Sequence, residues 1–198
     1  MKNKYSLADK IQLIYWLFRT KLIDRHARLF RFPIIIRGRE YIDFGHKLTT
    51  GVGCRFDVYP LYTKKDKIIV RFGNNVQIND YVHIVGMESI IIGDNVLMAS
   101  HIFISDNSHG SYKGDEHDSV PDVPPMQREY RTSPVSIGKN TWIGEGVIIM
   151  PGVTIGEGCV IGAHCIVNKD IPNFCIAIGS PIHIVKKYNY SLKKWEKV

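Results

Sequence analysis

A six-residue repeat runs from Phe44 to Val167, and no other feature of the sequence restricts the possible folds as strongly. One large residue recurs at every sixth position, in groups of three. A helix would show apolar spacings of three and four, and an ordinary strand a spacing of two. We call these fifteen places the lead positions; all are apolar except Thr50. They are Phe44, Thr50, Phe56, Phe72, Ile78, Ile84, Ile92, Met98, Ile104, Ile137, Ile143, Ile149, Ile155, Ile161 and Val167.

Three lead positions make a unit of 18 residues, which predicts one coil of a triangular prism with three flat strand faces. Lead side chains should point inward, and glycine follows eight of them, where a Cβ would crowd the next coil. A smaller residue four positions after a lead position should pack near the corner. The sequence therefore predicts an all-β fold, a parallel β-helix of about five coils. The smaller residues are Leu48, Cys54, Val76, Val82, Val96, Ile102, Val147, Val153, Cys159, Cys165 and Ile171.

Two segments interrupt the repeat. An insert at residues 57–69 carries tyrosine and lysine side chains, and a longer loop spans residues 106–134. The loop has two histidines and four carboxylates within Asp106–Asp118, and prolines on its return. Because a long irregular loop in so regular a scaffold is usually functional, we expect the active site there.

The segment Ser6–Phe32 is predicted to be an amphipathic helix that Pro33 ends. Two roles fit it. It can cap the open end of the prism, since the ends of stacked coils expose unpaired edges. It can also dock on an anionic membrane surface, helped by Trp16 and basic side chains. Its apolar stripe consists of Leu7, Ile11, Ile14, Leu17, Phe18 and Leu22.

The net charge of +7 is concentrated at the two ends of the chain. Residues 1–39 have ten Lys/Arg and two acids, and residues 183–198 have five and one, so the body between them is acidic. This distribution indicates anchoring or phosphate contacts, and with no nucleic-acid-binding signature we expect no nucleic-acid partner. We find no secretory signal and no apolar run of about 20 residues that could cross a membrane. The protein is expected to be cytoplasmic, with peripheral contact at the inner membrane face as the alternative.

The four cysteines form no C-x-x-C pair, and a chain of this length needs no disulfide bonds. We expect Cys54, Cys159, Cys165 and Cys175 to be small buried apolar residues in a reducing compartment.

Residues 137–172 read IGKNTWIGEGVIIMPGVTIGEGCVIGAHCIVNKDIP, and GSPIHIVK follows at 179–186. These blocks resemble the bacterial hexapeptide-repeat acyltransferases. The likeness is strongest to maltose and galactoside acetyltransferases and to capsule and lipopolysaccharide O-acetyltransferases, and it is clearest over residues 70–187. It implies a left-handed β-helix, a homotrimer, and acetyl-CoA as co-substrate in a groove between neighbouring prisms.

The resemblance also implies a catalytic base, a histidine at the start of the loop, and His109 matches it. The chemistry agrees, because a sugar hydroxyl must lose its proton as it attacks a thioester and imidazole can accept it. His117, in the same loop, is the second choice. Asp106 or another loop carboxylate is a candidate to orient the imidazole. Other histidines are expected to be face or interface residues: His83, His101 and His164.

Further positions are implied to contact acetyl-CoA. Trp142 is expected at a corner, pointing outward beside the thioester, where its indole N–H can donate. Small residues on adjacent coils, Gly144, Gly162 and Ala163, would border the pantetheine arm. Lys169 and Lys186 would neutralise phosphates.

The acceptor is less constrained. Maltose-type enzymes use an asparagine ahead of the loop to bind acceptor, and Asn79–Gly86 does not match that pattern; the basic helix also replaces their N-terminal acceptor module. We expect a carbohydrate acceptor, in a cell-envelope polysaccharide or its lipid-linked precursor. N-acetylation of an amino-sugar nucleotide or an antibiotic is the first alternative.

Two alternatives lie outside acyl transfer. One is a zinc enzyme like the γ-type carbonic anhydrases, since His83 and His101 lie 18 residues apart, although we predict no metal site. The other is a non-catalytic scaffold. The predicted division is a helix and lead-in at 1–40, the β-helix at 41–182 and a basic tail at 183–198.

Overall fold

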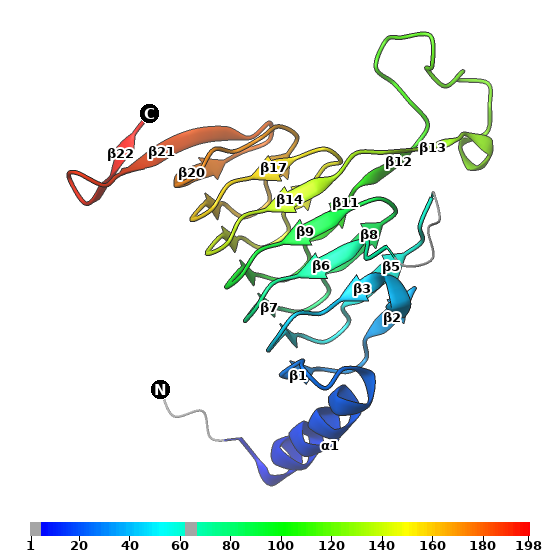
Figure 1. The fold of residues 1–198 in the computed structure, drawn as a ribbon. Helices are drawn as coiled ribbons and strands as arrows, with labels where there is room; N and C mark the ends of the chain where they lie inside the picture. The colour runs from blue at the N-terminus through cyan, green and yellow to red at the C-terminus, as the bar shows by residue number, and fades with distance from the viewer. Residues whose placement is uncertain (1–4, 62–66) are drawn as a thin grey trace.

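The computed structural model describes residues 5–61 and 67–198, which form a left-handed parallel β-helix, as predicted (Figure 1). Each coil adds one strand to the first, second and third faces in turn. The first face contains β1 (Leu29–Phe30), β4 (Thr49–Thr50), β7 (Gln77–Ile78), β10 (Leu97–Met98), β15 (Trp142–Ile143), β18 (Val160–Ile161) and β20 (Cys175–Ile178). The second contains β2 (Ile35–Arg37), β5 (Arg55–Val58), β8 (His83–Gly86), β11 (Phe103–Ser105), β16 (Ile148–Ile149) and β19 (Ile166–Val167). The third contains β3 (Ile42–Asp43), β6 (Val70–Phe72), β9 (Ile90–Ile92), β14 (Val135–Ile137) and β17 (Thr154–Ile155).

The core is one continuous column inside the three faces. All fifteen lead positions are buried, none exposing more than 1% of its surface, and the eleven smaller residues are buried too. Near the N-terminal end the rings of Phe30, Phe44, Phe56 and Phe72 pack with centroids 5.2 to 6.2 Å apart. Such aromatic contacts stabilise the core beyond the area they bury.

The number of residues per coil is not constant. Trp142 pairs with Val160, eighteen positions later, whereas Leu29 pairs with Thr49, twenty positions later. A further coil, formed by β1, β2 and β3, precedes those predicted from the six-residue pattern. The parallel sheets therefore begin at Leu29, inside the lead-in segment.

The extra residues of the longer coils leave the prism at one corner, between the second and third faces. In successive coils this corner holds the short helix η1 (Arg39–Tyr41), the insert after β5, a turn at residues 87–89 and the loop after β11. Residues 62–66 of the insert lie outside the described residues. The loop begins and ends with an antiparallel ribbon, β12 (Asn107–His109) and β13 (Tyr130–Thr132), and contains the short helix η2 (Pro125–Gln127). Figure 1 shows it standing out from the prism.

The N-terminal helix is shorter than predicted. Helix α1 spans Leu7–Ile23, and the prediction that it continues to Phe32 is wrong. Ser6 caps its start in a reciprocal capping box with Asp9. After Ile23, the Asp24 carboxylate accepts backbone N–H groups of the turn that follows, and the chain then enters β1. For Leu29 and Phe30, pairing in the edge strand of the first face outweighs helix propensity.

The basic C-terminal segment, which was predicted only as a tail, is a β-hairpin. Strand β21 (His183–Asn189) pairs antiparallel with β20 and with β22 (Lys194–Lys197), and the ribbon extends away from the prism (Figure 1). The ring of Tyr188 packs edge-on against those of Tyr190 and Trp195. None of the helices in the described part of the chain combines the length and apolar character needed to span a bilayer.

Candidate active site

His109 ends β12, the strand that carries the chain out of the prism into the loop. Its partner in β13 is Tyr130, and the two ring centroids lie 4.5 Å apart. The imidazole is exposed, and among the described residues no hydrogen bond engages its ring nitrogens. His109 therefore sits on an ordered ribbon with its ring accessible. No motif indicated the contact with Tyr130, which depends on the register of the ribbon.

A few polar contacts hold the loop beyond His109. The guanidinium of Arg128 donates to the backbone oxygens of Val123 at 2.9 Å and Pro121 at 3.1 Å, and to the Tyr112 hydroxyl at 2.6 Å. That hydroxyl in turn donates to the backbone oxygen of His109 at 2.5 Å. Arg128 and Tyr112 thus connect the return of the loop to the candidate base, a role that no motif indicated.

Asp106 does not orient His109, contrary to one of our expectations. Its carboxylate is fully buried and accepts the backbone N–H groups of Met87, Glu88 and Ser89, each at 2.8 Å. These three residues form the turn in which the coil carries two extra positions. Asp106 therefore fixes the corner from which the loop starts.

Trp142 lies in β15 on the first face, not at a corner as expected. Its side chain points outward and is 52% exposed. The strand register places it in a row that ends in the exposed Lys186, three strand spacings or about 14 Å away. The row runs through Leu97, Trp142, Val160, Ile176 and Lys186.

The predicted small residues meet beside this row, where the first face turns into the second. A Cβ on Gly144 would lie 2.7 Å from the backbone nitrogen of Ala163 and 2.9 Å from the carbonyl carbon of Gly162. Only glycine allows the coils to stack at this position, so Gly144 has a structural reason to be glycine. We call Trp142, Gly144, Gly162, Ala163 and Lys186 the first-face strip. Lys169 is exposed after β19 and does not join it.

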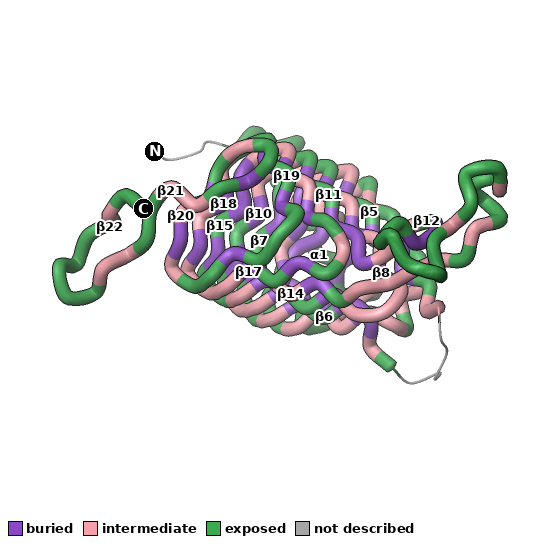
Figure 2. The backbone as a smooth tube through the Cα atoms, turned by 90° about the horizontal axis from the view of Figure 1, so that it is seen from above, coloured by how far each residue is buried: buried purple, intermediate pink, exposed green. Residues whose placement is uncertain are grey.

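The structure does not bring His109 and Trp142 together within one chain. His109 leaves from the corner between the second and third faces, and that corner lies opposite the first face of the triangle. Figure 2 shows the same separation, with β12 and β15 at opposite sides of the prism. A site containing both side chains therefore requires two protomers.

His83 belongs to an ion cluster on the second face. Its Nε2 lies 3.1 Å from Oδ2 of Asp57, a buried carboxylate that also pairs with Arg37 at 2.8 Å and with Arg55. Burial raises the pKa of Asp57, but the hydrogen bonds from Arg37, His83 and Arg55 outweigh it and hold that pKa below its usual range. The cluster links three neighbouring strands and has a structural role.

The other three histidines that were considered as candidates have separate surroundings. His101 stacks on Tyr81 with ring centroids 5.1 Å apart, and His164 is exposed where the first face turns into the second. The side chain of His117 is 68% exposed, and its Nε2 lies 3.8 Å from a carboxylate oxygen of Glu116. Within residues 5–61 and 67–198, no group of three His, Cys, Asp or Glu side chains is arranged to hold a metal ion.

Comparisons with known proteins agree with the geometry. The family described as bacterial transferase hexapeptide (six repeats) matches residues 134–169. The chain is 41% identical over 197 residues to the putative lipopolysaccharide biosynthesis O-acetyl transferase WbbJ of Escherichia coli K12, covering 100% of this chain and 97% of that protein.

Solved structures show the same architecture. A hexapeptide-repeat acetyltransferase of Vibrio cholerae, VCA0836, complexed with acetyl coenzyme A, is 29% identical with a TM-score of 0.59, over 76% of this chain and 74% of that one. A variant of AntD, an N-acyltransferase from Bacillus cereus in complex with dTDP and coenzyme A, has a TM-score of 0.69 at 21% identity, over 97% and 94% of the two chains. The second likeness concerns the fold alone.

Proposed function

The chain belongs to the hexapeptide-repeat acetyltransferases, and we propose that it transfers the acetyl group of acetyl-CoA to a sugar hydroxyl in the synthesis of a cell-surface polysaccharide. The observation that carries this proposal is an exposed histidine on the ordered base of the loop, together with a strip of small residues around an exposed tryptophan. Similarity to a putative lipopolysaccharide O-acetyl transferase over essentially the whole chain supports the acceptor class.

His109 is the proposed general base. The imidazole accepts the proton of the acceptor hydroxyl as the oxygen attacks the thioester carbonyl. A new C–O bond forms, the C–S bond breaks, and the proton passes from the imidazole to the departing thiolate. Since both substrates are held side by side, the reaction needs no acetylated enzyme, and proximity supplies much of the rate.

The first-face strip is the proposed contact surface for acetyl-CoA. The bare corner at Gly144, Gly162 and Ala163 leaves room for the pantetheine arm beside Trp142, whose indole N–H can donate to the thioester. Lys186, about 14 Å along the row, would neutralise a phosphate. Lys169 lies away from this strip, so it would contact a phosphate of acetyl-CoA only if that coenzyme were bound to the strip of another protomer.

A homotrimer completes the site in this proposal. The loop of one protomer would lie against the first face of the next, and three such heterologous contacts close a ring. The opposite placement of His109 and Trp142 within one chain supports a site shared between protomers.

This proposal assigns different roles to different segments of the chain. We assign transfer to the β-helix, whose coils begin at Leu29, together with Lys186 of the C-terminal hairpin, and a separate role to the N-terminal helix. We propose that the reaction takes place in the cytoplasm.

N-acylation of an amino sugar is the second candidate. The fold shared with the N-acyltransferase AntD favours it, because the prism and coenzyme groove suit either acceptor. An amine and a hydroxyl differ in the product, since an ester is released by mild alkali and an amide is not.

A thiol-release assay tests the proposal. Purified protein with acetyl-CoA is screened over mono- and oligosaccharides, and the products are treated with mild alkali. We expect acceptor-dependent release of CoA and an alkali-labile acetyl group. Alkali-stable product on amino sugars only would favour the second candidate, and absence of coenzyme binding by calorimetry would contradict both.

A further inference from the structure

Helix α1 turns most of its apolar side chains away from the prism. Five of them, 60 to 76% exposed, lie within about 80° of one another around the helix axis. We call this surface the outer face of α1. It consists of Leu7, Ile11, Ile14, Phe18 and Leu22.

The prism fixes this orientation. The opposite side of the helix contacts the first coil through Thr20, which is fully buried, and Ile23, which packs against the core. The Thr20 hydroxyl accepts the backbone N–H of Phe30 at 2.8 Å and donates to the backbone oxygen of Trp16 at 2.7 Å. The helix therefore cannot turn its outer face inward without breaking these bonds. Its stripe does not cap the prism, so the capping prediction holds only for the last turn of the helix.

Basic side chains border the outer face. Lys10 and Lys21 lie along one edge and Arg19 along the other, at helical spacing. Within the described residues, no carboxylate forms a salt bridge with any of the three. The acids of this segment are engaged elsewhere: Asp9 in the helix cap and Asp24 with a guanidinium at 2.9 Å. The outer face is thus apolar with a positive border.

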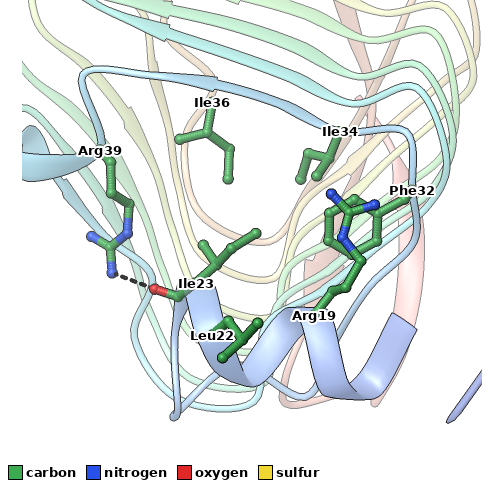
Figure 3. Close-up of a pocket in the computed structure, with 7 residues that line it drawn as sticks. All are labelled: Arg19, Leu22, Ile23, Phe32, Ile34, Ile36 and Arg39. Carbon is green, nitrogen blue, oxygen red and sulfur yellow. Dashed lines mark hydrogen bonds between the residues drawn. The ribbon is translucent and has the colours of Figure 1, made fainter. Parts of the chain in front are cut away.

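The apolar surface continues into a cleft of about 410 Å³ between α1 and the chain that follows β1. Figure 3 shows Ile23, Ile34 and Ile36 directed into it. At the edge of the cleft, the guanidinium of Arg19 lies 3.9 Å from the centre of the Phe32 ring. Leu22 belongs both to the outer face and to the cleft.

From these features we propose that α1 docks on an anionic membrane surface, with its outer face in the boundary between headgroups and acyl chains. An interfacial helix has this pattern of an apolar face flanked by Lys and Arg. The charge complementarity selects a membrane containing anionic lipids, because the border is positive and carries no acidic group. This docking proposal does not depend on the proposed transfer reaction.

The height of the loop above such a surface follows from the stacking. Strand β11, from which the loop departs, is three strands along the second face from β2, or about 14 Å. The helix itself adds about 10 Å. If the proposed transfer is correct, on which this step rests, the enzyme would acetylate the sugar portion of a lipid-linked acceptor that projects above the headgroups.

Vesicle co-sedimentation of the full chain tests the docking. The vesicles are phosphatidylcholine alone, or phosphatidylcholine with about one third phosphatidylglycerol. We expect binding to the anionic vesicles only, weakened by 0.5 M salt because screening shortens the reach of the border charges to a few ångströms. The double variant Ile11→Ser/Phe18→Ser should bind about tenfold or more weakly, since two exposed apolar side chains lose their place in the bilayer.

Two matched controls accompany it. Leu192→Ser and Met126→Ser alter exposed apolar side chains elsewhere, 56% and 83% exposed, and should bind as the unaltered chain does. Transfer to a soluble acceptor should be unchanged in the helix variant, so failure of docking and failure of transfer are read separately. Absence of binding to anionic vesicles, or equal binding by the double variant, overturns the proposal. A third result would also overturn it: the unaltered chain does not bind vesicles, and the double variant has a different oligomeric state in sedimentation. The outer face would then contact another copy of the chain.

Discussion

The prism and the loop at residues 106–134 are ordered in different ways. In the prism every lead side chain is buried and packs against neighbouring coils. The stability of the prism is therefore the sum of many equivalent contacts between adjacent coils. The loop has few buried residues and depends on single polar side chains, Arg128 and Asp118 among them. The prism therefore supplies stability and the proposed coenzyme surface, whereas the loop carries the proposed base, whose position depends on individual hydrogen bonds.

The largest effect should come from the loop, without loss of stability. His109→Ala removes the proposed base and should lower transfer by about 10²- to 10⁴-fold, the usual contribution of general base catalysis. Coenzyme affinity by calorimetry and the unfolding temperature should stay unchanged. His117→Ala in the same loop is the control and should retain activity. Equal losses in both variants would show that the loop, not His109, was disturbed.

The converse holds in the prism. Ile143→Ala removes a fully buried lead side chain and should lower the free energy of unfolding by about 2 to 5 kcal/mol. Met126→Ala, at a loop position that is 83% exposed, should have an effect near zero. Denaturant unfolding measures both. A similar cost at the two positions would mean that the loop is packed like the core, and that the two regions do not differ in how they are held.

Asp106 joins the two regions, and its replacement should have an intermediate cost. In Asp106→Asn the amide NH₂ would face backbone N–H groups that now donate to a carboxylate oxygen, which should cost about 1 to 3 kcal/mol. Transfer activity should fall as well, because the start of the loop loses its anchor. Asp122→Asn, at an exposed loop position, is the control for thermal unfolding and kcat. An unfolding temperature equal to that of the control would remove the anchoring role.

Trp142→Ala should give the smallest effect of the series. One hydrogen bond to the thioester and some packing would be lost, so we expect about tenfold weaker coenzyme binding and about tenfold slower transfer. The unfolding temperature should hardly change, because the indole is 52% exposed in the described chain. Unaltered coenzyme binding and unaltered transfer would show that Trp142 does not contact acetyl-CoA.

The sequence predicted the periodic part of the fold well, because the pattern and the packing have the same cause. Phe44 to Val167 are spaced by the geometry of a coil, so burial could be inferred from spacing. The first coil was not predicted, because Leu29 and Phe30 of its first strand fell within the segment expected to be helical. The end of α1 was not predicted correctly either, since Leu29 and Phe30 pair with β4 and this tertiary contact overrides helix propensity.

The candidate site was predictable in its residue types but not in its arrangement. An exposed position for His109 followed from the loop, but its contact with Tyr130 depends on the register of a ribbon with no repeat. Asp106 looked like a partner for imidazole because the two are close in sequence, whereas the carboxylate satisfies three backbone N–H groups in the preceding coil. Such long-range satisfaction of buried polar groups leaves no local trace in sequence.

The central claim is that one protomer supplies His109 and the next supplies the first-face strip. Two inactive variants test it, His109→Ala and Ala163→Trp, the latter blocking the strip with a bulky side chain at an exposed position. The two chains carry different tags, are co-expressed, and the hybrid assemblies are isolated through both tags. Sites between protomers predict recovered transfer, about one third of the unaltered level, because each mixed trimer contains one intact site among its three. Hybrids that form but stay inactive would contradict the account.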